Sequence, residues 1–172
     1  MKPYPRIENS LSTSRLKLDI LALEDYDFIS SLVNTMGWIE YIGDRNVHSK
    51  NDAIAYINKI LSTENLFYWV VRISETNTPI GIISFLKRSY LENFDIGFAF
   101  LPDHSGNGFA FEATKEILLM ISKNAEFKLV LATTISSNEK SIKLLTKLGF
   151  SFEKEIQVEN QKLAIYTNKL LL

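Results

Sequence analysis

Two glycines stand where they could hold a phosphate group. In FDIGFAFLPDHSGNGFAFEA, residues 94–113, an alternating apolar stretch leads to Gly106 and Gly108, and an apolar stripe of helical period follows. Glycine has no β-carbon to keep a ligand from the backbone, and the first free N–H groups of the helix point back into the turn. The pattern predicts a diphosphate seat, although an ordinary tight connection would look the same.

Two better-known nucleotide motifs are absent from this turn. A P-loop requires a lysine followed by Ser or Thr after its last glycine, and no such pair follows Gly108. A dinucleotide fingerprint requires a third glycine, and Phe111 stands in its place. The turn is therefore neither of these two nucleotide-binding motifs.

A second segment, FKLVLATTISSNEKSIKLLTKLGFSF, predicts a strand, a loop, a helix, a glycine stop and another strand over residues 127–152. Ser136 to Asn138 supply a helix N-cap, and Gly149 stands where a helix-ending glycine belongs. Taken alone, this is also the pattern of an ordinary strand–helix–strand unit.

Taken together in this order, the two segments resemble the GNAT superfamily of acyl-CoA-dependent N-acyltransferases, and the likeness covers most of the chain. It is closest to the branch of ribosomal-protein N-terminal acetyltransferases (RimJ/RimL-like). The matching features are the opening Thr13 to Leu16, the acidic helix start Leu23 to Asp25, the strand DIGFAFLP, the turn Gly106 to Ala113 and the segment Asn138 to Phe150. The resemblance implies transfer of an acetyl group from acetyl-CoA, a co-substrate used without a metal, to a primary amine of a small molecule or of a protein N-terminus.

The resemblance also implies how the cofactor lies. Its pantetheine pairs with the free edge of the strand, its diphosphate sits in the turn, and its thioester lies beside the start of the later helix. The expected cofactor-binding residues are Phe98, Phe100, Leu101, His104, Ser105, Gly106, Asn107, Gly108, Phe109, Ala110, Asn138 and Ser141. Asp103 stands where the family usually has Gln or Arg, so it is expected to point outward or to cap the helix. His104 is also consistent with an exposed loop histidine.

The candidate general base for the amine is Asp95, because the family often has an acidic residue at this point of the strand. The alternative is a polar residue on a half-solvated strand face. Glu92, Glu40 and Glu112 are weaker candidates, and Glu112 could equally favour the helix N-terminus through its charge.

Many relatives use a tyrosine as the general acid, and this chain has Leu145 in that place. Ser141 is therefore the candidate to donate a hydrogen bond to the departing thiolate, and the alternative is an exposed residue of the first helical turn. The missing tyrosine and Asp103 leave open a CoA-sensing or peptide-binding module without turnover. A protein that never binds CoA is a third possibility.

The acceptor is expected to meet the loop TMGWIEYIGDRNVHS, residues 35–49. Aromatic rings there could form flat walls, and carboxylates could attract an ammonium. The candidate acceptor-binding residues are Trp38, Glu40, Tyr41, Asp44 and Arg45. The competing interpretation is that Trp38, Ile39, Tyr41 and Ile42 are core residues that anchor a long connection.

Composition bounds the class of protein. The chain has 172 residues, of which 46% are hydrophobic and 23% charged, so one domain over residues 1–172 is expected. The absence of cysteine excludes disulfides and thiolate chemistry, and His48 and His104 alone make a metal site improbable. The net charge of -1 gives no footprint for nucleic acid. No apolar stretch suits a signal peptide or a membrane span, so a cytoplasmic location is the default expectation.

The elements that must position these residues follow from the periodicity of the apolar side chains. Strands are expected near residues 15–21, 67–74, 79–87, 93–101, 128–134, 150–157 and 161–169, and helices near 24–35, 50–62, 108–124 and 138–148. This is an α/β (α+β) chain with a mixed sheet and helices on both faces. The resemblance implies a mostly antiparallel sheet of six to seven strands, splayed between the fourth and the fifth. The closing strands leave a monomer or a homodimer open.

Overall fold

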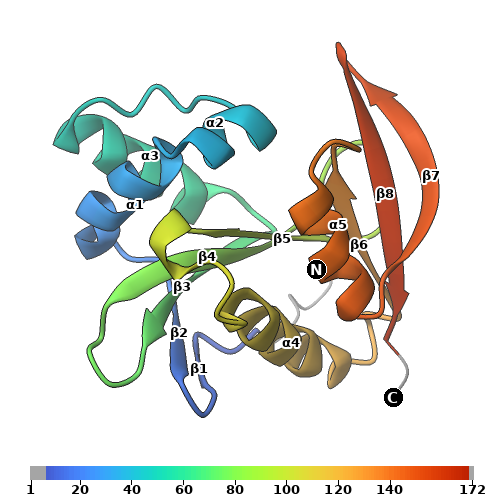
Figure 1. Ribbon diagram of the computed structural model, residues 1–172, viewed down its shortest axis with the longest axis horizontal. Coiled ribbons are helices and arrows are strands. Elements are labelled where there is room, and N and C mark those ends of the chain that lie inside the picture. Colours follow the sequence, from blue (N-terminus) through green and yellow to red (C-terminus); the bar gives the residue numbers. More distant parts are fainter. Residues whose placement is uncertain (1–6, 171–172) are drawn as a thin grey trace.

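The computed structural model describes residues 7–170 and shows a mixed sheet of eight strands with helices on both faces (Figure 1). Across the sheet the order is β1 (Ser10–Ser12), β2 (Leu16–Ile20), β3 (Leu66–Ile73), β4 (Pro79–Leu86), β5 (Asp95–Phe100), β6 (Leu129–Thr134), β8 (Gln161–Lys169) and β7 (Ser151–Val158). All neighbours are antiparallel except β5 and β6. The predicted class is confirmed, with one strand more than predicted. The extra strand is β1, which is too short to show a period.

The first half of the chain contains more, shorter helices than its sequence suggests, and the helices of the whole described chain follow here in order. They are η1 (Leu23–Asp25), α1 (Tyr26–Val33), α2 (Met36–Tyr41), α3 (Lys50–Ser62), η2 (Pro102–His104), α4 (Phe109–Ser122) and α5 (Glu139–Lys147). The predicted loop 35–49 contains α2, which Thr35 caps by accepting a hydrogen bond from the Trp38 N–H at 3.3 Å. Six residues with an internal glycine show too little periodicity to predict a helix.

Alternation along the central strands feeds two hydrophobic cores, one on each face of the sheet. Trp69 and Ile83 pack with α4 on one face, and Val70 and Ile82 pack with α1 and α3 on the other. The opposite faces of β3 and β4 are therefore both buried, which holds these strands as a rigid centre for the site.

The sheet splits between β5 and β6, which correspond to the fourth and fifth predicted strands. Their parallel ladder is reduced to Asp95 paired with Leu131, whose N–H donates to the Phe94 carbonyl at 2.9 Å. In a continued ladder the next N–H, that of Thr133, would donate to the Ile96 carbonyl. It donates instead to the Asp95 carboxylate at 3.0 Å, so the strands diverge from this point (Figure 1).

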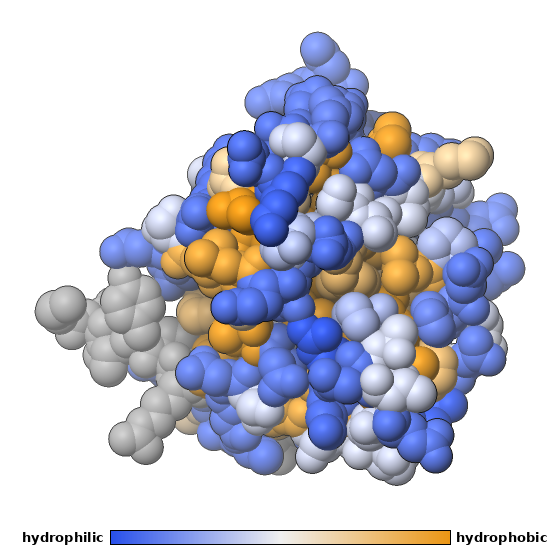
Figure 2. All heavy atoms as spheres, turned by 90° about the vertical axis from the view of Figure 1, so that its left-hand side faces the viewer, coloured by the Kyte–Doolittle hydropathy of each residue, from blue (hydrophilic) through white to orange (hydrophobic). Residues whose placement is uncertain are grey.

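The outer surface around α1 and α3 is mixed in character. Figure 2 views this side and shows hydrophobic side chains interspersed with hydrophilic ones. Among residues 7–170 no helix has both the length and the apolar character that a membrane span requires.

Candidate active site

The glycine turn presents open backbone donors. Gly106 and Gly108 have φ angles of +82° and +78°, in the left-handed region that favours glycine. Gly108 is the N-cap of α4 and offers no side-chain cap, and the first helical hydrogen bond runs from the Glu112 N–H to the Gly108 carbonyl at 3.0 Å. The N–H groups of residues 109–111 therefore face outward as a helix N-terminus that can bind an anion. A β-carbon built at Gly106 would meet no atom within 4 Å, so this space is open.

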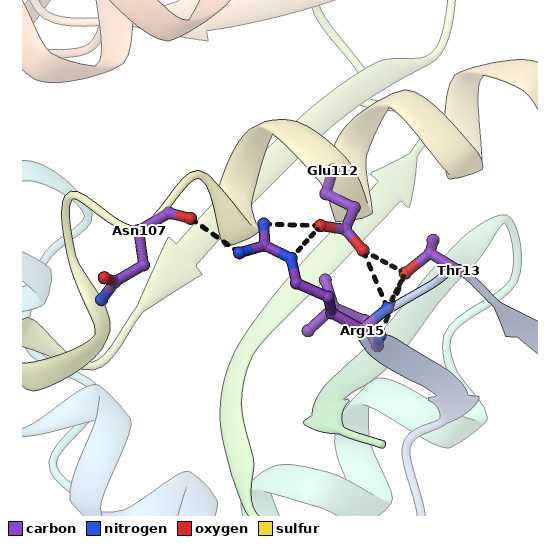
Figure 3. A network of polar contacts seen from close by, with 5 residues as sticks. Thr13, Arg15, Asn107 and Glu112 are labelled. Carbon is purple, nitrogen blue, oxygen red and sulfur yellow. Dashed lines mark hydrogen bonds and ion pairs between the residues drawn. The ribbon is translucent and has the colours of Figure 1, made fainter. Parts of the chain in front are cut away.

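A polar network ties this turn to the start of β2 (Figure 3). The Glu112 carboxylate accepts from Arg15 Nε at 2.7 Å, pairs with Arg15 Nη2 at 2.6 Å, and accepts from the Thr13 hydroxyl. Arg15 Nη1 donates to the Asn107 carbonyl at 3.2 Å, and the guanidinium lies 4.5 Å from the centre of the Phe109 ring. Arg15 thus contacts the turn, the first residue of α4 and Glu112 together.

The charge of Glu112 is committed to this network. Desolvation alone would raise the pKa of Glu112, but the hydrogen bonds from Thr13 and Arg15 hold it below its ordinary value. The side chain is absent from the lining of the neighbouring cavity, so the network accounts for it without a catalytic role.

A cavity of about 620 Å³ passes through the splay between β5 and β6. Its lining comes from α2, β3, β4, β5, β6, β8, α5 and the start of α4. The sequence-predicted residues that it brings together are Trp38, Tyr41, Arg45, Asp95, Phe98, Phe100, Ser105, Ala110, Asn138 and Ser141. Residues of the 94–113 segment, of the 127–152 segment and of the 35–49 segment therefore line one cavity.

The other predicted site residues lie outside this lining. Gly106, Asn107, Gly108 and Phe109 form the stretch between Ser105 and Ala110, which do line the cavity, whereas Leu101, His104, Glu40 and Asp44 have no place in the lining. Glu40 is exposed, and Asp44 accepts a hydrogen bond from the Asn46 N–H at 2.7 Å. Asp103 is exposed, which agrees with the expected outward position. It does not cap α4, because that helix has no side-chain cap.

The free edge of β5 has unpaired backbone groups on the splay side. The Leu101 N–H donates to the Ile80 carbonyl of β4. Along a strand, the N–H and C=O groups of successive residues point alternately to the two neighbouring strands. The N–H and C=O groups of Phe98 and Phe100 consequently face the gap, where the ladder to β6 has ended. This edge can pair with the amides of an extended ligand.

Asp95 lies at the vertex of the splay and is only 1% exposed. It forms an ion pair with Arg88 and accepts from the Thr133 N–H at 3.0 Å and the Thr133 hydroxyl at 3.3 Å. Burial raises the pKa of Asp95, while Arg88 and Thr133 oppose the rise. The alternative of a half-solvated strand position is wrong, because the Asp95 side chain is buried.

Asn138 and Ser141 stand at the start of α5. The Asn138 amide oxygen accepts from the Ser141 N–H at 3.2 Å, which is the predicted N-cap. The cap uses the Asn138 oxygen and the Ser141 backbone, so the Asn138 amide nitrogen and the Ser141 hydroxyl are not committed to it. Leu145 also lines the cavity and brings no proton donor.

The cavity reaches both faces of the sheet. Phe98 and Phe100 pack with the core under α4, whereas Tyr68 packs with the core under α1 and α3. Cross-strand register places Asp95 on the same face as Tyr68, because Leu66, Leu86 and Asp95 form one row. We call the part on this face the α2 chamber. It is lined by Trp38, Tyr41, Arg45, Tyr68, Arg88 and Tyr90.

Three residues of the α2 chamber were not predicted from the sequence. Arg88 and Tyr90 belong to the β4–β5 connection, whose Asn and Ser residues indicate only a turn, and Tyr68 is one of several aromatic residues in β3. An alternating strand does predict that Tyr68 and its neighbours face opposite sides, but the sequence does not show which side meets a cavity. The core interpretation of the 35–49 segment holds for Trp38, which is 4% exposed, and not for Ile39 and Ile42 at 45% and 42%.

Within residues 7–170 no three His, Cys, Asp or Glu side chains form a group that could hold a metal ion. The cavity lining carries carboxylate, hydroxyl, amide, guanidinium and ammonium groups.

Comparison with known proteins identifies the family of this arrangement. A family model described as acetyltransferase (GNAT) domain matches residues 15–151. The N-acetyltransferase YnaD of Bacillus subtilis is 26% identical over 143 residues, 83% of each chain. The structure of a ribosomal-protein-S5-alanine acetyltransferase from Vibrio fischeri aligns with a TM-score of 0.79 at 18% identity, covering 94% of this chain and 97% of the other. That of spermidine N-acetyltransferase from Vibrio cholerae, with CoA and spermine, aligns with a TM-score of 0.76 at 20% identity, covering 92% and 97%. At these identities the two structures show a shared fold.

Proposed function

Because this chain belongs to the GNAT acetyltransferase family, we propose that it acetylates a protein N-terminal amine by direct attack of that amine on the thioester of acetyl-CoA. Membership makes the chain an acetyl-CoA-dependent acyltransferase that acts on an amine. The choice of a protein N-terminus is the proposed part. The observation that carries the proposal is the cavity, which joins the glycine turn to the α2 chamber through the splay.

The proposed acceptor rests on two further points. The chain shares its fold with a ribosomal-protein-S5-alanine acetyltransferase, and it has the Thr13 to Leu16 opening that resembles this branch. The α2 chamber is walled by aromatic side chains and lies beside the exposed helix α2. Such a space suits the first residues of an extended chain that enters from solvent.

The cofactor would be held mainly by the backbone. Its diphosphate would accept from the N–H groups of residues 109–111, and its pantetheine amides would pair with Phe98 and Phe100. The Asn138 amide nitrogen is free to donate at the thioester end. Acetyl-CoA supplies an activated acyl group, so positioning provides much of the acceleration.

The reaction needs a neutral amine, a proton acceptor and a stabilised leaving group. The amine nitrogen bonds to the carbonyl carbon, the C–S bond breaks, and the nitrogen loses a proton. Asp95 is the proposed base, because its raised pKa and its place in the cavity suit proton abstraction. Ser141 is proposed to donate a hydrogen bond to the departing sulfur, whose thiol pKa near 8.5 requires little further assistance.

Calorimetric titration with acetyl-CoA, followed by thiol release with N-terminal peptides, tests this function. We expect micromolar binding to the native protein and none to a Gly106→Glu, Gly108→Glu variant, whose carboxylates would occupy the diphosphate seat. Circular dichroism should show that the variant is folded. Binding of acetyl-CoA without CoA release in the presence of any peptide would contradict the proposed acceptor.

A further inference from the structure

The α2 chamber is rich in hydrogen-bond donors and poor in free negative charge. Within residues 7–170 the whole cavity lining includes one carboxylate, that of Asp95, and Arg88 already pairs with it. Arg45 also lines the chamber, and no acidic side chain is paired with it among the described residues. An acceptor bound here therefore meets the guanidinium of Arg45 with no carboxylate of the described residues paired to it.

Both arginines line the α2 chamber. Desolvation raises the pKa of the Tyr68 hydroxyl, and the positive charges of Arg45 and Arg88, which line the same chamber, act against that rise. The guanidinium of Arg45 lies 6.0 Å from the centre of the Trp38 ring. The chamber thus has Arg45 from the 35–49 segment and Arg88 from the β4–β5 connection in the same lining as Tyr68 and Trp38.

A second observation also indicates a missing acceptor of hydrogen bonds. The Nε1–H of Trp38 is buried and has no partner among the described residues. An indole N–H can only donate, and a guanidinium can only donate. A buried donor without a partner is costly and indicates a water or ligand oxygen close to it.

We propose that the amine acceptor carries a carboxylate, which Arg45 binds beside Trp38. This deepens the proposed function and rests on it, since it concerns the acceptor of the same reaction. Carboxylate oxygens pair with guanidinium in charge-assisted hydrogen bonds. A polyamine or a lysine-rich peptide would instead bring further positive charge toward Arg45. The two candidate anionic acceptors are a peptide with an acidic residue near its N-terminus and a free amino acid.

The positive charge also suits the chemistry. A cation close to a bound amine lowers the pKa of its ammonium form and so increases the fraction of neutral nucleophile. A chamber built to attract an ammonium by a free carboxylate would do the reverse. The same group therefore selects the acceptor and favours its reactive form.

The test compares kcat/KM for CoA release with matched short peptides that carry Glu, Ala or Lys at the second position, with glutamate and with spermidine. We expect the Glu peptide to exceed the Lys peptide by about tenfold or more, the factor that one charge-assisted pair commonly supplies. The variant Arg45→Glu should reverse this order. Lys143→Glu makes the same charge change on the exposed face of α5, outside the cavity lining, and should keep the native order.

Each result of this panel has a separate meaning. Equal rates for all peptides, a preference for the Lys peptide or spermidine, or an unchanged order in Arg45→Glu would overturn the inference. Acetylation of glutamate with no acetylation of peptides would support the carboxylate and overturn the protein N-terminus. CoA release with none of these amines would overturn both, and acetyl-CoA titration of each variant checks that the cofactor site is intact.

Discussion

Asp95 serves two physical purposes at one position. Its carboxylate takes the place of a backbone acceptor for the Thr133 N–H and so ends the β5–β6 ladder, and its pairing with Arg88 places a guanidinium beside the cavity. A base and a strand separator would both need a buried carboxylate here. The role of base and the role of strand separator differ in their dependence on pH and in their effect on stability.

Asp95→Asn should lower kcat by about 10² to 10⁴ if the carboxylate is the base. It should also lower the free energy of unfolding, because Arg88 would lose its partner inside the protein. Acetyl-CoA affinity should change little. The measurements are steady-state kinetics and urea unfolding of the same preparations.

Arg88→Gln separates the two roles of Asp95. It destabilises the fold in the same way but keeps the carboxylate, whose pKa should rise further without the guanidinium. The acidic limb of the profile of kcat/KM against pH should therefore move to higher pH. If Arg88→Gln keeps the native profile, Asp95 acts through structure and not as the base.

Ser141→Ala should lower kcat by about tenfold or less, since one hydrogen bond to a good leaving group is removed. Acetyl-CoA affinity should stay within about twofold, because the α5 cap uses the Ser141 backbone rather than its hydroxyl. Single-turnover thiol release and calorimetry measure the two quantities. An unaltered kcat would remove Ser141 from the chemistry, and Ser141→Thr serves as the variant that retains the hydroxyl.

At the scale of elements, the glycine turn depends on a neighbour far away in sequence. Arg15 contacts Asn107 and Glu112 from the start of β2 (Figure 3), and it also lies against the Phe109 ring. The proposed diphosphate seat is therefore held by two elements. Arg15→Gln should weaken acetyl-CoA binding by roughly five- to tenfold. Without Arg15 the turn would be ordered only on binding, and the free energy cost of that ordering reduces affinity. The kcat at saturating cofactor should be little changed, which kinetics at varied acetyl-CoA concentration will measure.

Arg15→Lys distinguishes the effect of the several guanidinium hydrogen bonds of Arg15 from the effect of its positive charge. Lysine keeps the charge but cannot make the paired contacts to Glu112 and the turn, so it should restore only part of the affinity. Full restoration would show that charge near the phosphates, rather than the network, is what matters. Dephospho-CoA, which lacks the 3′-phosphate, provides a further check. If Arg15 contacted that phosphate directly, the native protein and the variant would bind dephospho-CoA with equal affinity.

The network also makes stability depend on pH in a defined direction. The pKa of Glu112 is lowered from its ordinary value of 4.5, so the folded state favours the ionised form. Its contribution to stability is present above that ordinary value and is lost as the pH falls through the lower folded value. Urea midpoints measured from about pH 6 to about pH 3 should fall less steeply for Glu112→Gln than for the native protein. Parallel slopes would contradict the shift.

The sequence predicts these elements unevenly, for physical reasons. Helix α3 at Lys50–Ser62 matches its predicted range of 50–62, because its amphipathic stripe is long and Ser49 caps it. Helix α2 and strand β1 were missed, since each is shorter than two periods of its pattern. For the site, the turn, Asp95 and Asn138 follow from motifs within one segment. Arg88 and the Arg15–Glu112 pair follow from contacts between segments, which spacing in one sequence does not encode.

At the scale of the whole molecule, the splay divides the sheet into two parts joined by a short ladder. One part runs from β1 to β5, and the other contains β6, β8 and β7 (Figure 1). The lining of the cavity comes from both parts. A ligand that pairs with the β5 edge and contacts α5 would touch both parts. Its binding should therefore strengthen the junction as well as fill the cavity.

Hydrogen exchange with and without acetyl-CoA measures that strengthening. Saturation at 100 times the dissociation constant should stabilise the folded state by about 2.7 kcal/mol, which slows every amide that exchanges by global unfolding. Beyond this uniform effect, the amides of Phe98, Phe100 and residues 109–111 should slow further, because they exchange from the native state and would become hydrogen-bond donors to the cofactor. Amides of Trp69 and Ile83 in β3 and β4 serve as the internal control, since both strands are already paired on each side. If the extra slowing were equal at the β5 edge and at these control positions, the cofactor would not be lying along the splay.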